Sequence, residues 1–245
     1  MDHLRTLAEL QERFLETTRR GDPATPILWL GRWRVEQLVV HLARIHHWAA
    51  GQARREQETP LGRGPFDDLP ALYEVCAAEL RATLAELDPD ARAWALVDDG
   101  VPRAQQRGTV RFWYRRQLHE TLVHLWDLRT AIGEGVDDLG IGDEVWLDCL
   151  DEVVGVMHPR QLRLERVAPP AARIVFAPTG ADASWTLAGA PDDAPVVTVA
   201  GPASALALLA WGRGVPDDDR LAGAGVEVKG ERSLADAVLR AGITP

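Results

Sequence analysis

The chain has 245 residues, with 27 Lys and Arg against 37 Asp and Glu, so its formal net charge is −10. This acidic balance argues against nucleic acid or an anionic membrane as the main partner, because both favour clustered positive charge. It is still compatible with a small anionic ligand in a local basic pocket. Hydrophobic residues make up 46% of the chain, which is enough for a folded core and excludes intrinsic disorder. The length predicts one large domain or two small ones.

The cysteine content points to a reducing compartment. The two cysteines, Cys76 and Cys149, are too few for a disulfide scaffold or a thiolate zinc cage. Both fall in amphipathic helical patterns, so we expect them in the core rather than as nucleophiles. The N-terminal residues lack a signal-peptide pattern, and no window approaches the ~18 apolar residues of a membrane span. We therefore expect a cytoplasmic protein without a membrane partner.

The first two thirds of the chain have the apolar spacing of amphipathic helices. Helices are predicted over residues 2–20, 33–50, 67–87, 109–132 and 143–157. Thr109 is a candidate N-cap and Gly133 a candidate C-cap of the fourth helix. A loop rich in Pro and Gly separates the second helix from the third. Successive helices joined by loops predict a four- or five-helix bundle.

The pattern changes after residues 167–170, which have the sequence VAPP. Strands rich in β-branched and aromatic residues are predicted over 173–176, 184–187, 196–199 and 226–228. Helices are predicted over 202–211 and 233–239. The expected fold is therefore an α-helical bundle over residues 1–165, joined to a small α+β domain over residues 171–245.

The fourth predicted helix carries His119, Glu120 and His124. The zinc-protease pattern HExxH is not met, because its two histidines lie four residues apart on one helical face. His119 and His124 lie five apart and diverge by about 140° around a helix. Glu120 and His124 lie four apart, about 40° from each other, and therefore share a face.

A carboxylate and an imidazole on one helix, together with a histidine from a facing helix, form the type of metal site that helical bundles build in their cores. His41, between Val40 and Leu42 in the second predicted helix, is the candidate partner. Such N and O ligands with open positions suit a catalytic Zn²⁺. The alternative is a solvated face or a simple hydrogen-bonded pair. The apolar neighbours favour the metal, because buried polar groups without partners are costly.

Two segments resemble motifs of the mycothiol-dependent maleylpyruvate isomerase family. Residues 33–42, WRVEQLVVHL, are similar to its W-x-V-x-x-L-V-x-H-L segment, and residues 116–128, RQLHETLVHLWDL, to its R-x-x-H-E-x-x-V-H-x-W-D segment. The resemblance covers nearly the whole chain. All basic residues except Lys229 are Arg and there is no Asn, as in proteins from high-GC genomes. This agrees with the resemblance, since mycothiol is the thiol of the mostly high-GC actinobacteria.

The resemblance implies a DinB-like four-helix bundle joined to a domain similar to sterol carrier proteins. It implies that His41, Glu120 and His124 bind a divalent metal, Zn²⁺ in the first place, and that mycothiol is the thiol cosubstrate. Residues 209–213, LAWGR, resemble the family's L-x-W-G-R stretch, so Arg213 is the candidate catalytic residue. The alternative for Arg213 is an ordinary cation at a helix end.

Other polar residues near these motifs have less specific expectations. Asp127 could orient a ligand histidine or form a surface ion pair with Arg129 or Arg116. His46 and His47 are expected at ordinary polar positions near the mouth of the bundle.

Together these features predict a metal-dependent enzyme that activates a small thiol for addition to, or transfer onto, a small electrophile. A metal-coordinated thiol is deprotonated, and an arginine near the site would bind a substrate carboxylate. One alternative is a DinB-like protein that binds a metal or small ligand without turnover, as a sensor or carrier. Another is a metal-dependent hydrolase built on the same three ligands.

Overall fold

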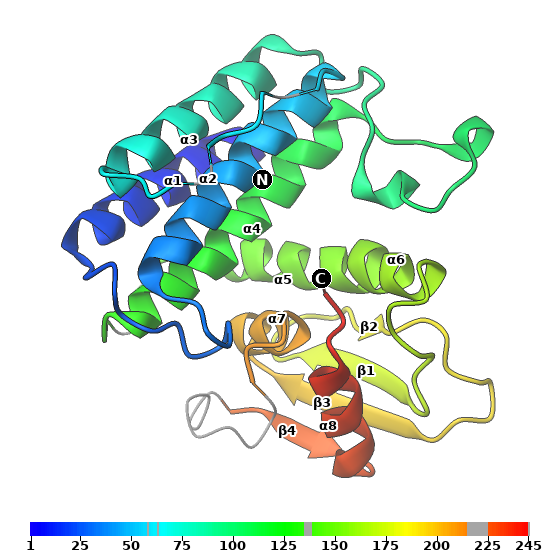
Figure 1. The fold of residues 1–245 in the computed structure, drawn as a ribbon. Helices are drawn as coiled ribbons and strands as arrows, with labels where there is room; N and C mark the ends of the chain where they lie inside the picture. Colours follow the sequence, from blue (N-terminus) through cyan, green and yellow to red (C-terminus); the bar gives the residue numbers. More distant parts are fainter. Residues whose placement is uncertain (58, 63, 135–138, 215–224, 245) are drawn as a thin grey trace. The chain divides into compact units, whose positions relative to one another are not determined.

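A computed structural model describes residues 1–57, 59–62, 64–134, 139–214 and 225–244. The chain divides into two compact units (Figure 1). The first consists of residues 1–98 and 102–140, and the second of residues 99–101 and 141–245. Each unit has its own arrangement of helices or strands, and the two are described in turn.

The first unit is a bundle of four long helices. They are α1 (His3–Arg20), α2 (Val35–Arg54), α3 (Leu69–Glu86) and α4 (Val110–Ala131). Helix α2 packs against α3 and α4, and α1 packs against the same two helices, so the four close around a common core. The predicted bundle is confirmed, with each helix boundary within about four residues of its predicted position.

Local capping fixes where these helices begin and end. The side chains of Asp2 and Asp68 each accept a hydrogen bond from a backbone N–H in the first turn of α1 and α3. Thr109 is the N-cap of α4, as predicted, but its side chain makes no capping hydrogen bond. The C-cap of α4 is Ile132, and Gly133 follows it with φ +78°, the left-handed conformation that favours glycine after a helix.

The segment before α4 is held by a buried carboxylate. It contains two short 3₁₀ turns, η1 (Leu96–Asp98) and η2 (Arg103–Gln105). Asp98 is 4% exposed and accepts hydrogen bonds from the backbone N–H groups of Arg107, at 2.7 Å, and Gly108, at 2.9 Å. These bonds close a loop directly before α4 and so fix the start of the helix that carries the candidate ligands.

The second unit combines helices with a mixed sheet (Figure 1). It begins with α5 (Asp143–Glu152), a π-helical turn (Val153–Met157) and α6 (His158–Arg163). The strands are β1 (Arg173–Pro178), β2 (Trp185–Thr186), β3 (Val196–Gly201) and β4 (Glu227–Lys229), in the order β2-β1-β3-β4. Strands β1 and β3 are parallel and the outer pairs antiparallel. Helices α7 (Ala203–Ala210) and α8 (Arg232–Ala241) both contact β3.

This unit confirms the predicted change from helices to a small mixed α and β fold. Alternate residues of β1 and β3, among them Ile174, Phe176, Val197 and Val199, are fully buried, as expected for strands with one face in a core. The predicted helix over 143–157 is interrupted by the π-helical turn and continues to Arg163.

The division between the compact units differs from the predicted boundary. The prediction placed the bundle at 1–165 and the α+β domain at 171–245, whereas the compact units divide at Gly140. The reason is that α5 packs against α7 and therefore groups with the sheet. The domain limits themselves stay a prediction.

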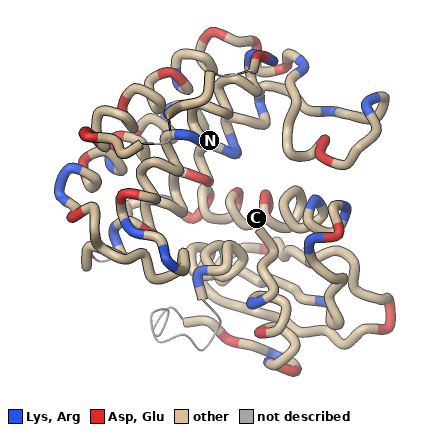
Figure 2. The backbone as a smooth tube through the Cα atoms, viewed as in Figure 1, with Lys and Arg blue, Asp and Glu red and all other residues tan. Residues whose placement is uncertain are grey.

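Charged residues of both signs are interspersed along the helices of the first unit (Figure 2). Among the described residues, no helix is both long enough and apolar enough to cross a membrane.

Candidate metal centre

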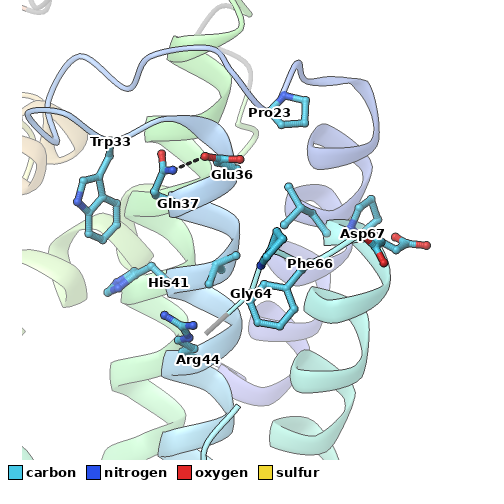
Figure 3. A pocket seen from close by; sticks show the side chains of 14 residues that line it. Pro23, Trp33, Glu36, Gln37, His41, Arg44, Gly64, Phe66 and Asp67 are labelled. Atoms are coloured by element: carbon cyan, nitrogen blue, oxygen red, sulfur yellow. Dashed lines mark hydrogen bonds between the residues drawn. The ribbon is translucent and has the colours of Figure 1, made fainter. Parts of the chain in front are cut away.

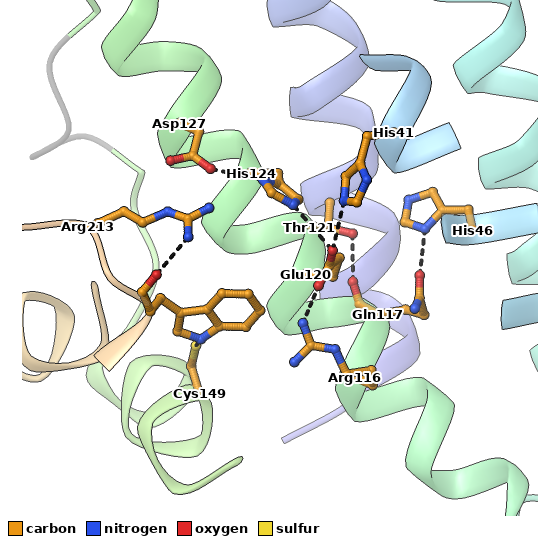
Figure 4. A network of polar contacts seen from close by, with 11 residues as sticks. His41, His46, Arg116, Gln117, Glu120, Thr121, His124, Asp127, Cys149 and Arg213 are labelled. Atoms are coloured by element: carbon orange, nitrogen blue, oxygen red, sulfur yellow. Dashed lines mark hydrogen bonds and ion pairs between the residues drawn. The ribbon is translucent and has the colours of Figure 1, made fainter. Parts of the chain in front are cut away.

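The packing of α2 against α4 brings the three predicted ligands together (Figure 4). The Nε2 atom of His41 lies 3.3 Å from Oε1 of Glu120, and the Nε2 atom of His124 lies 3.2 Å from the same oxygen. One ligand atom from each residue can be chosen so that all three lie within 4.8 Å of one another. Two imidazole nitrogens therefore converge on one carboxylate oxygen.

Glu120 uses its second oxygen differently. Oε2 accepts a hydrogen bond from Arg116, one helical turn earlier on α4, and Arg116 is only 3% exposed. Burial alone would raise the pKa of Glu120, but Arg116 and the two histidines outweigh it and hold the pKa well below its usual value. Glu120 is therefore a carboxylate at neutral pH, with Oε1 directed at the imidazoles.

His124 is oriented by Asp127. Its Nδ1 atom lies 2.9 Å from Oδ2 of Asp127. Two roles were predicted for Asp127, and this contact corresponds to the first, in which Asp127 orients a ligand histidine. Burial lowers the pKa of His124, but hydrogen bonds with Asp127 and Glu120 raise it by more. A carboxylate that accepts from Nδ1–H leaves Nε2 as the coordinating nitrogen of a histidine ligand.

His41 forms the more open side of the cluster. Its side chain is 29% exposed, against 6% for His124 and 12% for Glu120. The ring meets that of His124 edge-on, with centroids 5.1 Å apart, and packs against Trp33 at 4.9 Å. These two contacts hold the imidazole ring in place. The partial exposure of His41 leaves this side of the cluster accessible.

The donor set fits a divalent cation. Two imidazole nitrogens, which give up any proton when they coordinate, and one carboxylate oxygen are ligands that Zn²⁺ takes in catalytic sites with an open position. The contact between His124 and Asp127 adds the supporting carboxylate that such ligands commonly have.

The neighbouring histidines do not join the cluster. His46 was expected near the mouth of the bundle, but it is fully buried, with Nδ1 at 2.8 Å from the side-chain oxygen of Gln117. Burial lowers the pKa of His46 to about 4. His47 lies 2.5 Å from a carboxylate oxygen of Glu79. His119 is fully buried in α4.

Arg213 belongs to the second unit and follows α7. It is 7% exposed, donates to the carbonyl of Trp211 at 2.7 Å, and its guanidinium carbon lies 5.8 Å from the centre of the Trp211 ring. These contacts are local to the end of α7. The role of Arg213 toward the metal centre stays a prediction.

Both cysteines are buried, as predicted. Burial, with a further contribution from Glu79, raises the pKa of the Cys76 thiol to about 11. The sulfur of Cys149 accepts a hydrogen bond from the indole of Trp211 at 3.1 Å. A buried thiol with a raised pKa is a poor nucleophile at neutral pH, so Cys76 is a core residue.

A groove of about 700 Å³ opens beside His41, between α2 and residues 64–70 (Figure 3). From the sequence alone, this part of the chain is predicted only as a loop and a helix start, and nothing there indicates a site. The available signal was Phe66, an aromatic residue in an otherwise turn-rich segment. His41 lines the groove and also belongs to the ligand cluster.

Comparison with protein families assigns both parts of the chain. Residues 4–129, more than half of the chain, match the mycothiol maleylpyruvate isomerase N-terminal domain, and residues 144–237 match the MDMPI C-terminal domain. The chain belongs to the mycothiol-dependent maleylpyruvate isomerase family. The family resemblance seen in the two sequence motifs is thus confirmed.

Solved structures of this family share the fold. A crystal structure of the mycothiol-dependent maleylpyruvate isomerase superposes with a TM-score of 0.64 at 15% identity, covering 94% of each chain. A histidine-to-alanine mutant of a mycothiol-dependent maleylpyruvate isomerase gives a TM-score of 0.62 with the same identity and coverage. No curated protein matches the chain significantly.

Proposed function

We propose that this protein is a metal-dependent enzyme that uses a small thiol, mycothiol in the first place, to attack a small electrophile. The observation that carries the proposal is the convergence of His41 and His124 on one oxygen of Glu120 in a member of this family. Isomerisation of a substrate like maleylpyruvate and transfer of the thiol onto an electrophile are both compatible with these residues.

His41, Glu120 and His124 would hold the metal ion. Bound there, the ion would supply a thiolate at neutral pH by lowering the pKa of a coordinated thiol. The protein contributes orientation: Arg116 restrains one oxygen of Glu120, and Asp127 restrains the ring of His124. The buried cysteines leave the nucleophile to come from an external thiol.

Isomerisation follows from reversible addition. The thiolate forms a bond to the β-carbon of an α,β-unsaturated carbonyl compound. The π pair of the C=C bond moves between the α-carbon and the carbonyl carbon, and the π pair of the C=O bond moves onto the oxygen. Rotation about the resulting single bond and expulsion of the thiolate give the other geometric isomer, with no thiol consumed. Arg213 would hold a substrate carboxylate in a bidentate contact during this rotation.

The first test measures metal. We expect about one divalent ion per chain in the purified protein, and a large loss in His124→Ala, because that variant removes one of three ligands. His3→Ala, a histidine at the start of α1, is the matched control and should keep its metal. Equal, near-zero metal in the native protein and in His124→Ala would contradict the proposed site.

The second test measures the reaction. Maleylpyruvate and a panel of other electrophiles are each incubated with mycothiol, with N-acetylcysteine and without thiol. Isomerisation conserves free thiol, whereas transfer consumes one thiol per product, so a thiol titration separates the two. Metal and thiol binding without turnover of any electrophile would instead support the sensor or carrier alternative. Thiol-independent hydrolysis would support the hydrolase alternative.

A further inference from the structure

A second groove in the first unit lies at the C-terminal end of α2. It is lined by Arg55, Arg92 and Arg103 among other residues, and we call it the arginine groove. Its volume is about 490 Å³, within the range of small-molecule pockets. Arg55 follows His41 by fourteen residues, so it lies about 21 Å further along the axis of α2. The arginine groove is therefore separate from the candidate metal centre and does not depend on the proposed function.

The three arginines come from three separate segments and have few partners of their own. Arg55 is the C-cap of α2, Arg92 lies between α3 and η1, and Arg103 begins η2. Arg92 donates to the carbonyl of Gln106. Within the ranges that the structure describes, the side chains of Arg55 and Arg103 make no hydrogen bond or ion pair. Guanidinium groups that gather in one groove repel one another, and a bound anion would remove this repulsion.

The negative groups of the arginine groove already have partners. Asp98 is 4% exposed and accepts hydrogen bonds from the backbone N–H groups of Arg107 and Gly108. Oε2 of Glu56 lies 3.6 Å from Nε of Arg54, which is outside the groove. The carbonyl groups at the end of α2 carry a partial negative charge, but two of them accept from the backbone N–H groups that follow the helix. The guanidinium groups are thus the charges left for a ligand.

The rest of the lining suits the uncharged part of an organic ligand. Trp94 is half-buried and lines the groove. Its ring packs against the rings of Trp48 and Trp113, with centroids 6.0 and 6.3 Å away, so its position is held by the core of the bundle. The side chain of Gln52 adds an amide that can donate or accept a hydrogen bond. An aromatic ring beside guanidinium groups favours an anion that also has an apolar body.

We infer that the arginine groove binds a small organic dianion, either a phosphate ester or a dicarboxylate. The two share the chemistry that the groove recognises, because a guanidinium group pairs with two oxygens of a phosphate or a carboxylate in a bidentate contact. A bound dianion would join the end of α2 to the loop before α4, since Arg55 belongs to the first and Arg103 to the second. Ligand binding would therefore stabilise the folded first unit.

Calorimetry with two probes tests the inference and separates the two sources of the dianion. Phenyl phosphate represents the phosphate esters and succinate the dicarboxylates, and each is titrated into the metal-loaded protein at constant ionic strength. We expect at least one probe to bind the native protein. The same probe should bind about tenfold or more weakly to the double variant Arg55→Gln, Arg103→Gln, because two charge-assisted contacts are lost.

The matched control is a second double variant, Arg5→Gln, Arg240→Gln. Both of these arginines are exposed and lie outside the arginine groove, and the two double variants lose the same charge. The control should bind the probe like the native protein. The probe should also raise the unfolding temperature of the native protein and the control, but not that of Arg55→Gln, Arg103→Gln. No binding of either probe to the native protein would overturn the inference. Equal binding to the native protein and Arg55→Gln, Arg103→Gln would also overturn it, because the anion would then bind elsewhere, for example at the metal.

Discussion

Glu120 shows how a buried carboxylate is stabilised and kept available. Its two oxygens have separate partners: Arg116 bonds Oε2, and the two imidazoles face Oε1. A buried charge without such partners would be strongly destabilising. Because the ion pair with Arg116 already satisfies one oxygen, Glu120 would bind a metal through the other, as a ligand of one oxygen.

Asp127 is predicted to strengthen metal binding through His124. Its removal in Asp127→Ala should weaken metal affinity about 10- to 100-fold, because the ring of His124 loses the acceptor that orients it. Asp127→Asn keeps an acceptor oxygen, so its metal affinity should lie between those of the native protein and Asp127→Ala. Competition with a chromogenic chelator measures the affinity. Asp90→Ala, which removes a surface partner of Arg111, is the control. Equal affinities for Asp127→Ala and the native protein would rule out this role.

His46 is predicted to make folding stability depend on pH. Burial lowers its pKa from 6.5 to about 4. The unfolded chain therefore takes up a proton before the folded one, and the free energy of unfolding falls as the pH drops from about 6.5 toward about 4, by up to about 3 kcal/mol.

The variant His46→Gln has no imidazole to protonate, so its free energy of unfolding should fall less over the same pH range. Urea unfolding at about pH 7 and about pH 4.5, with chelator present in every sample, gives the change in the free energy of unfolding with pH for each of the two proteins. An equal loss of stability in the native protein and His46→Gln would show that His46 does not cause it.

At the scale of the elements, the loop before α4 is closely packed around Gly108. A Cβ atom added at Gly108 would lie 2.3 Å from Oδ2 of Asp98 and 2.4 Å from the backbone oxygen of Ala93. The backbone oxygen cannot move away without breaking the loop, since Gly108 and Ala93 are hydrogen-bonded to each other. The loop thus admits only glycine here for reasons of space.

Gly108→Ala is therefore predicted to lower the free energy of unfolding by about 3 kcal/mol, the upper end of the usual cost of overpacking, because the nearest atoms include a backbone oxygen. Gly155→Ala is the matched control: Gly155 is exposed in the π-helical turn, and a Cβ there meets nothing within 4 Å. That variant should be neutral or slightly stabilising. Thermal unfolding compares the two variants with the native protein. If Gly108→Ala unfolds at the same temperature as the native protein, the loop can rearrange to accept a Cβ atom.

At the scale of the whole molecule, the residues named in the proposed function come from both compact units. The three candidate ligands belong to the first unit and Arg213 to the second. A metal-binding bundle alone would hold a thiol, whereas an anchor for the substrate carboxylate comes, on this proposal, from the unit that contains the sheet.

Arg213→Ala is predicted to keep its metal and to lose about 10- to 100-fold in kcat/KM on a verified carboxylate substrate, because a charge-assisted contact to substrate is lost. Arg213→Lys should recover part of the activity, since it restores the charge but not the bidentate geometry. Arg240→Ala, exposed on α8, is the control. If the Arg213→Ala variant has the same unfolding temperature as the native protein and keeps full activity, Arg213 does not bind the substrate carboxylate.

The sequence by itself determined the helices, the strands and part of the cluster. Helical periodicity is a property of the local backbone, so the spacing of Glu120 and His124 predicts a shared face before any packing is known. The same spacing relates Arg116 to Glu120, although the sequence alone could not show whether Arg116 faces inward or outward.

Only the tertiary structure decided which side chains meet across helices. His41 meets Glu120, while His46, five residues later on α2, bonds Gln117 in the core. The local sequence pattern also could not predict that α5 groups with the sheet. Nor could it predict the groove beside Phe66. The physical reason is that the rotation and axial register of one helix against another are set by the fit of whole buried surfaces, which no single segment contains.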